Sequence, residues 1–260
     1  MNVKKWLVLA LSISFVPVVQ AEEVPQSKSE FCSQYKSMKG NRTQVILGQD
    51  EMRMAFQNNG GLINGGVCWW HSRFQRNAAY LTIFRPDLPI PSSNEAKEII
   101  KDIRFATDVI TIPGFANFNE FSRYFRAEIQ SRLDGWQRTD GFLKQQWIVG
   151  LAGASETTQE KMKKGMDNLY KQVSQGDVVY QKLQIKGIVA HAWLVIGMTK
   201  VANGYDLEVI DSNSPVRTQA YRYREGDTSF YHYYYGNFVP YTGHNRELNK
   251  LKKKVKKFCK

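Results

Sequence analysis

GGVCWWHSRFQRNAAY, residues Gly65–Tyr80, places a cysteine directly after two glycines and before a helical pattern. Apolar residues recur at three- and four-residue steps here, which predicts a helix from Val67 to about Ile83. Cys68 would then lie at the helix N-terminus, where unsatisfied N–H groups and the helix dipole favour a thiolate. Cys68 is therefore a candidate nucleophile, beside the simpler interpretations of a buried apolar residue, half of a disulfide or a metal ligand.

The pattern around this stretch predicts helices first and strands afterwards. Helices are expected over 95–105, 117–133 and from a Ser155 cap to Gly176, with short strands at 43–49 and 107–113 and a glycine- and asparagine-rich loop over 52–66. Four later segments are rich in β-branched and aromatic residues and read as strands: 178–186, 188–198, 205–212 and 230–238. This segregation is typical of an α+β fold with an antiparallel sheet in the C-terminal half.

A histidine and an aspartate flank a predicted hairpin in this C-terminal half. His191 begins an apolar strand, Asn203-Gly204 supplies a strong turn signal, and the returning strand ends at Asp211. The two side chains are thus expected side by side at one sheet edge, where a carboxylate would hold the imidazole tautomer and stabilise imidazolium. Each residue alone is more often structural, but together with Cys68 they predict a Cys-His-Asp triad. Asn213 is a rival orienting residue.

The chain contains three cysteines. In an oxidising compartment cysteines commonly pair in disulfides, so an odd number leaves one unpaired. Cys32 and Cys259 lie near the two chain ends, which often approach each other in a domain. We expect a Cys32–Cys259 disulfide, which leaves Cys68 as the free thiol.

Residues 1–21 have two lysines followed by a short apolar run and a small-residue cleavage site. This predicts a secretory signal peptide and a secreted or periplasmic protein with no transmembrane segment after signal removal. Residues 22–260 are long enough for a single domain with one sizeable core.

The formal net charge is +12, and lysines gather in the tail over 245–260. The simpler interpretation of this tail is a solvated basic helix end. The functional alternative is attraction to an anionic surface such as a membrane or a cell-wall polymer. No nucleic-acid recognition motif is present, and no nucleic-acid partner is expected.

The segments GGVCWW, HAWLVIG and YDLEVIDSN resemble the papain-like superfamily of cysteine peptidases. In that family a nucleophilic cysteine heads a central helix, a His-Ala dipeptide begins a strand, and an Asn or Asp follows the next strand. The resemblance covers about 65–80 and 187–215. It implies Cys68 as the nucleophile, His191 as the general base and acid, and Asp211 or Asn213 as the residue that orients the imidazole.

The family often has a glutamine a few residues before the cysteine as an oxyanion donor, and this chain departs from that pattern. Asn64 is the nearest amide and is the substitute candidate, with Gln57 further upstream. The resemblance implies a thiol hydrolase of peptide or amide bonds that needs no cofactor. Its substrate would be a peptide or protein, with cell-wall peptide among the options.

Other functions remain open at this stage. The same triad can transfer the acyl group to an amine, as transglutaminases do, or the fold can serve as an inactive binding protein. A third alternative is a surface-interaction protein that uses the basic tail. A zinc site built from Cys68, His71, His191 and Asp211 is a weaker alternative, and His71 is expected at the surface or a cleft edge. The aromatic strand 230–238 is either core or a wall that contacts substrate.

Overall fold

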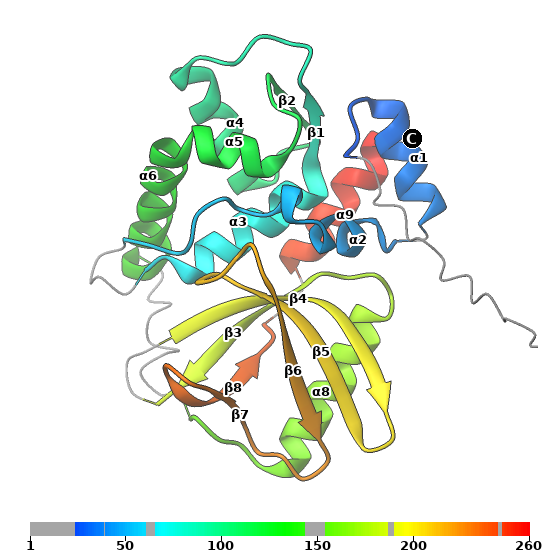
Figure 1. Ribbon diagram of the computed structural model, residues 1–260, viewed down its shortest axis with the longest axis vertical. Coiled ribbons are helices and arrows are strands. Elements are labelled where there is room, and N and C mark those ends of the chain that lie inside the picture. Colours follow the sequence, from blue (N-terminus) through cyan, green and yellow to red (C-terminus); the bar gives the residue numbers. More distant parts are fainter. Residues whose placement is uncertain (1–23, 39, 61–65, 144–153, 187–189, 244–245) are drawn as a thin grey trace, which may run out of the picture.

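The computed structural model describes residues 24–38, 40–60, 66–143, 154–186, 190–243 and 246–260, and it combines a group of helices with a curved antiparallel sheet (Figure 1). This confirms the α+β class, although β1 and β2 lie among the helices and α9 follows the antiparallel sheet. The helical elements are α1 (Lys28–Ser37), α2 (Arg42–Gly48), the 3-10 helix η1 (Asp50–Met52), α3 (Cys68–Leu81), α4 (Ser93–Phe105), α5 (Phe118–Tyr124), α6 (Arg126–Gln137), the π-helical η2 (Arg138–Leu143), α8 (Gln159–Val173) and α9 (Arg246–Phe258).

Two sheets are formed by the described strands. A small parallel sheet pairs β1 (Thr82–Arg85) with β2 (Ile110–Pro113). The larger sheet is antiparallel and has the order β6-β5-β4-β3-β8-β7. Its strands are β3 (Val179–Ile185), β4 (Ala190–Val201), β5 (Gly204–Asp211), β6 (Thr218–Arg224), β7 (Phe230–His232) and β8 (Gly236–Tyr241).

Strand β4 is central to the packing because helices cover both of its faces. Ala192 and Leu194 belong to apolar clusters that include α3, whereas Trp193 and Val195 pack in a cluster with the apolar face of α8. This alternation follows from the period of two along a strand. This packing holds the start of α3 against the beginning of β4, where His191 lies.

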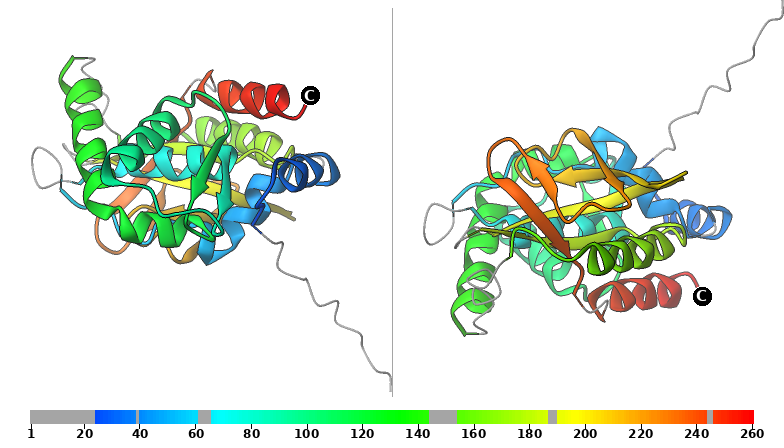
Figure 2. Two further views of the ribbon diagram at one scale, coloured as in Figure 1. Left: turned by 90° about the horizontal axis from the view of Figure 1, so that it is seen from above. Right: turned by 90° about the horizontal axis from the view of Figure 1, so that it is seen from below.

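The two ends of the described chain meet at one end of the molecule, where α1 and α9 lie in both views (Figure 2). Cys32 of α1 and Cys259 form a disulfide, as predicted. Phe31 and Phe258 make an edge-to-face ring contact beside it, with ring centroids 5.8 Å apart. The signal peptide predicted over 1–21 lies outside the described residues.

Several predicted boundaries were wrong. The strand expected over 43–49 is α2, because Thr43, Ile46 and Leu47 are buried together at helical spacing while Val45 faces outward. The helix expected over 117–133 is broken at Phe125, and the polar helix is capped by Thr158 rather than by Ser155.

The aromatic segment 230–238 is not one strand. It is the hairpin of β7 and β8, with a turn over 233–235 that ends at Gly236, whose φ is +73°. The turn places Tyr233 and Tyr234 in solvent, so the prediction of a single strand over 230–238 was wrong. Strand β6, whose sequence TQAYRYR is largely polar, was not predicted.

Candidate active site

Helix α3 begins at Cys68, and Asn58 fixes the chain that leads into it. The Asn58 side-chain oxygen accepts a hydrogen bond from the Val67 N–H, while the Asn58 N–H donates to the Ser212 carbonyl (2.7 Å). Ser212 directly follows β5, so one residue joins the start of α3 to the end of that strand. Gly66 has a φ of +76°, and its backbone lies so close to the Asn58 side chain that a Cβ there would collide with it.

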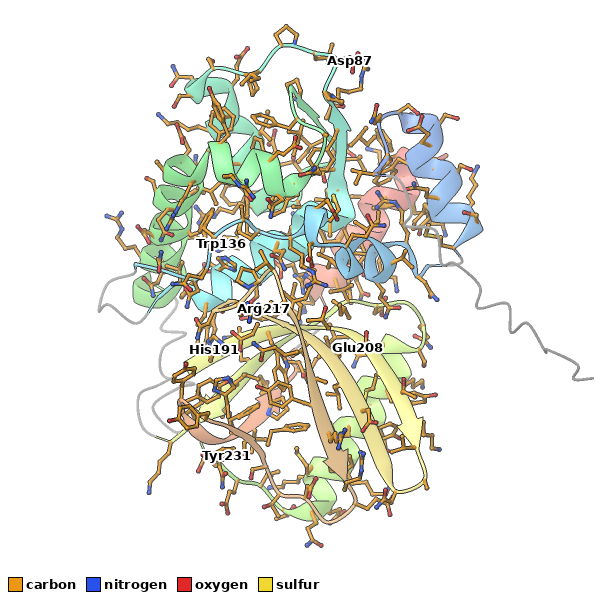
Figure 3. All side chains as sticks on the ribbon, viewed as in Figure 1. Asp87, Trp136, His191, Glu208, Arg217 and Tyr231 are labelled. Carbon is orange, nitrogen blue, oxygen red and sulfur yellow. A yellow bond between two sulfur atoms is a disulfide. The ribbon has the colours of Figure 1, made fainter. Side chains whose placement is uncertain are left out.

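The start of β4 is tied to the first turn of α3. The indole Nε1 of Trp69 donates to the His191 carbonyl (3.0 Å). The Ala192 carbonyl accepts hydrogen bonds from the hydroxyls of Ser72 and Ser212, each at 3.4 Å. His191, the second residue of β4, thus lies beside Cys68. Figure 3 shows His191 at the boundary between the helices and the sheet.

The structure brings together the three residues of the predicted triad. His191 Nε2 lies 2.6 Å from Asp211 Oδ1, and His191 also makes a side-chain hydrogen bond with Cys68. With Nε2 facing Asp211, Nδ1 is the ring nitrogen left for the thiol. All three side chains are buried, with Cys68 and His191 each 5% exposed and Asp211 1% exposed.

Asn213, the rival orienting residue, does not contact the imidazole through its side chain. Its backbone N–H donates to Asp211 Oδ1 (2.7 Å), and its side-chain oxygen accepts from Asn58 Nδ2 (3.2 Å). Asn213 therefore holds the Asp211 carboxylate in place, and Asp211 faces the histidine.

The electrostatics of the group favour a charged imidazole. Burial alone would lower the pKa of His191, but hydrogen bonds to Asp211 and Cys68 and the charges of both residues raise that pKa well above its ordinary value. Burial would raise the pKa of Asp211, yet His191 and the Asn213 N–H hold it below its usual range. The site therefore places an imidazolium between a carboxylate and a cysteine that begins a helix.

His71 was expected at the surface or a cleft edge, and this was wrong. It is 1% exposed, its Nε2 lies 2.9 Å from the Phe56 carbonyl oxygen, and its Nδ1 has no hydrogen-bond partner among the described residues. Burial lowers the pKa of His71 to about 4. It is therefore a neutral imidazole that fixes the chain upstream of Cys68.

Aromatic rings of the β7–β8 hairpin also lie near His191. The Tyr235 ring centroid lies 5.6 Å from that of His191, and His232 stacks on Tyr235 at 4.2 Å with an interplanar angle of 11°. The exposed Tyr233 and Tyr234 lie in the same turn, 82% and 85% exposed. The β7–β8 hairpin thus connects the histidine to an aromatic surface.

The basic tail forms α9, which packs one apolar face on the fold and leaves most of its lysines in solvent. Leu248, Leu251 and Val255 bury one face of α9. Glu247 forms salt bridges with Arg73 and Arg76 of α3, at 2.9 Å for Arg73 Nη2, and these two arginines lower the pKa of Glu247 to about 2 against the opposing effect of burial.

A second carboxylate, which is itself buried, contacts α3 nearer to its start. Asp140 Oδ2 accepts hydrogen bonds from the indole N–H of Trp70 (3.3 Å) and that of Trp136 (2.8 Å), and it pairs with Arg73 Nη1 (3.2 Å). The helix that carries Cys68 is therefore fixed along its length by charged and polar contacts.

The zinc alternative finds no support in the ligand geometry. His71 Nε2 faces a backbone carbonyl and His191 Nε2 faces Asp211. Across the part of the chain that the structure describes, no group of three His, Cys, Asp or Glu residues could hold a metal ion. None of the helices described there is long and apolar enough to cross a membrane.

Sequence reasoning named the three central residues but missed those that hold them. Trp69 lies in the GGVCWW segment, but its contact with the His191 carbonyl was not predicted. Asn58 and Lys182 stand in no recognisable motif. The doubled tryptophan after Cys68 was the one sequence feature that could have indicated a residue holding the triad in place. Asn64, the oxyanion candidate, lies outside the described residues.

No protein-family model matches the chain. No curated protein and no solved structure is a significant match either. The functional conclusion therefore depends on the geometry and chemistry of the site itself.

Proposed function

We propose that this protein is a thiol hydrolase of peptide or amide bonds, with Cys68 as the nucleophile. His191 is the general acid and base, and Asp211 orients it. The observation that carries the proposal is the continuous contact from Cys68 through His191 to Asp211, buried where α3, β4 and β5 meet. A nucleophile, its base and a third residue that orients the base are what thiol catalysis requires.

In the acylation step the Cys68 thiolate attacks the carbonyl carbon of the substrate. A carbon–sulfur bond forms, and the negative charge moves to the carbonyl oxygen. The first N–H groups of α3 and the positive end of its dipole favour that charge. The imidazolium of His191 then gives its proton to the leaving amine, the carbon–nitrogen bond breaks, and a thioester remains on Cys68.

In the deacylation step His191 accepts a proton from water, and the hydroxide attacks the thioester carbonyl. The carbon–sulfur bond breaks, the acid leaves, and Cys68 returns as a thiolate beside imidazolium. An amine in place of water would give acyl transfer, the transglutaminase-like alternative. Asp211 remains ionised throughout, because its charge stabilises the imidazolium.

Two features of the layout are those that the resemblance to papain-like peptidases implies. The cysteine heads a helix, and that helix packs against the strand that supplies the histidine. The Cys32–Cys259 disulfide is compatible with the proposed secreted or periplasmic location. The substrate that we propose is a peptide or protein, and cell-wall peptide is one of its forms.

The first test is the pH dependence of Cys68 alkylation by iodoacetamide in the folded protein without residues 1–21, read by intact mass and peptide mapping. We expect alkylation of Cys68 well below pH 8.5, about where a free thiol titrates, and loss of that low-pH reactivity in His191→Ala. Thermal unfolding of both proteins checks that the variant folds. A Cys68 that stays inert at every pH in the folded protein would overturn the proposal.

Turnover separates the remaining alternatives. Peptide mixtures are incubated with the protein or with Cys68→Ala, with and without an added primary amine, and the products are identified by mass. Hydrolysis predicts a free acid, acyl transfer predicts an amide of the added amine, and both are lost in Cys68→Ala. Binding that survives Cys68→Ala without turnover would instead indicate an inactive binding protein.

A further inference from the structure

A lysine lies beside the proposed nucleophile, on the strand next to that of His191. The Lys182 Nζ is 3.7 Å from the centroid of the Trp69 ring, a cation–π contact. That ring is held in place because its Nε1 donates to the His191 carbonyl (3.0 Å). Trp69 directly follows Cys68, so the position of the ammonium is fixed relative to the thiol.

The sheet register places Lys182 on the face of β3 and β4 that packs against α3. Lys182 pairs with Ala192 across β3 and β4, while its neighbour Leu183 pairs with His191. Directly paired residues share a face of a sheet, and successive residues alternate between faces. Lys182 therefore shares its face with Ala192, whose methyl group packs in the cluster that contains Cys68 and Trp69.

The charges around Lys182 come from several elements. Desolvation lowers its pKa to about 8, with a further lowering by Arg73 and opposing contributions from Asp140 and Cys68. The ammonium thus remains mainly protonated at pH 7 and interacts with the thiol electrostatically. Its side chain is only partly buried, so part of it is accessible to a ligand.

We propose that Lys182 is a specificity-determining residue that binds a carboxylate of the substrate close to the scissile bond. The inference rests on the proposed hydrolase function and assigns it a substrate class, which is a peptide or amide with a carboxylate flanking the cleaved bond. A cation on a rigid indole attracts an anionic group without changing shape. A neutral substrate at the same position would gain nothing from this charge.

Two alkylating reagents test the inference without a known substrate. Iodoacetate carries a carboxylate next to its reactive carbon, and iodoacetamide is its neutral analogue. The rate constant for alkylation of Cys68 is measured with each reagent at pH 6.5. Dividing the iodoacetate rate constant by the iodoacetamide rate constant removes the dependence on the thiolate fraction, which is the same for both. We expect Lys182→Met to lower the iodoacetate-to-iodoacetamide ratio by about threefold to tenfold, because one nearby unit charge is removed. Lys182→Arg should retain most of the ratio.

The matched control is Lys200→Met, which removes the same charge from an exposed position near the far end of β4. Its ratio should equal that of the unchanged protein. A normal iodoacetamide rate in Lys182→Met shows that the site has folded. If that variant does not fold, the unchanged protein still gives an answer, because its ratio should fall as the pH rises through about 8.

The outcomes separate the inference from the proposed function. If Cys68 reacts with neither reagent, the hydrolase proposal fails, and the inference fails with it. If Cys68 reacts with iodoacetamide but its ratio is unchanged in Lys182→Met, only the inference is overturned. Equal loss of both rates would mean that Lys182 stabilises the thiolate and does not bind the carboxylate.

Once a cleaved peptide is known, paired substrates identify the source of the carboxylate. One pair has a free or an amidated C-terminus, and the other has Glu or Gln beside the cleaved bond. Lys182→Met should raise KM about threefold to tenfold for the carboxylate member of one pair. The KM of the neutral member of that pair should stay the same, and kcat should change less than KM. Equal KM changes for both members of both pairs would overturn the inference.

Discussion

Asp211 and Asn213 are two residues apart, and either one could have oriented His191 on sequence grounds alone. The structure gives Asp211 the side-chain contact and leaves Asn213 with a backbone contact to the carboxylate. The difference is chemical as well as geometric, because a carboxylate stabilises imidazolium and an amide lacks the charge.

Replacing Asp211 by Asn should therefore destabilise the imidazolium and lower the pKa of His191. We expect the rate of Cys68 alkylation by iodoacetamide at pH 5.5 to fall about tenfold or more, since one pKa unit corresponds to a factor of ten in that range. Asn213→Ala is the control and should change this rate by less than about threefold, because the backbone N–H on Asp211 remains. Equal losses in the two variants would contradict the assignment.

Because His71 is buried and neutral, we expect the free energy of unfolding to fall at acidic pH. Its pKa is lowered to about 4 in the folded chain, against an unperturbed value of 6.5. As the pH falls below 6.5 the unfolded chain takes up the proton first, so His71 destabilises the fold progressively between pH 6.5 and pH 4. The expected contribution at pH 5 is a loss of about 2 kcal/mol in the free energy of unfolding.

The measurement is urea unfolding at pH 7 and pH 5 for the unchanged protein and for His71→Gln. The variant is expected to lose less stability between the two pH values, although it is less stable at pH 7 because of its altered contact with Phe56. An identical pH-dependent loss in both proteins would show that His71 does not carry this sensitivity.

The start of α3 depends on a single glycine. Gly66 has positive φ, and a Cβ there would collide with the Asn58 side chain. Gly66→Ala should lower the free energy of unfolding by more than about 1 kcal/mol and slow Cys68 alkylation, because the chain must shift to relieve the clash. Gly165→Ala in α8 is the counterpart, with no atom within 4 Å of its added Cβ. It should stabilise by about 0.5–1 kcal/mol, and destabilisation of both variants alike would contradict a special requirement for glycine at position 66.

Helix α9 combines a buried apolar face with an exposed basic one. Lys253, Lys256 and Lys257 are exposed, and none has an ion pair within the described ranges. The anionic-surface interpretation of this helix stays a prediction. Deleting the tail would not test it cleanly, because Glu247 and Cys259 also anchor the fold.

Substituting these three lysines by glutamine should weaken binding to vesicles of phosphatidylcholine and phosphatidylglycerol by about tenfold or more at low salt. Each lysine near an anionic membrane surface contributes about 1 kcal/mol. The control replaces Lys97, Lys161 and Lys164, which are exposed and scattered over other helices. Equal weakening in both triple variants would indicate net charge rather than a dedicated surface.

The disulfide joins the two ends of the described fold across a sequence separation of 227 residues. Because it restricts the unfolded chain, the double substitution Cys32→Ser with Cys259→Ser should lower the free energy of unfolding by about 2–5 kcal/mol. Denaturant unfolding with and without a reductant measures this loss. Cys68→Ser keeps the disulfide and should remain reductant-sensitive, whereas a reductant-insensitive protein would contradict the prediction.

The sequence by itself determined the α+β class, the position of Cys68 at the head of a helix, the placement of His191 and Asp211 at strand ends, and the pairing of Cys32 with Cys259. Each of these follows from a local pattern: helical or strand periodicity, an Asn-Gly turn, or the chemistry of cysteine in an oxidising compartment. Local patterns failed for α2 and for the aromatic hairpin, because β-branched and aromatic composition also fits a buried helix or a turn beside a sheet.

Only the tertiary structure decided the contacts that surround the predicted triad. The burial of His71, the position of Lys182 on the Trp69 ring and the choice of Asp211 over Asn213 all depend on how α3 packs against β3, β4 and β5. The physical reason is that these contacts join segments far apart in the chain or depend on a one-residue change of strand register. Sequence periodicity gives the face on which a residue lies, but packing determines its neighbours across the interface.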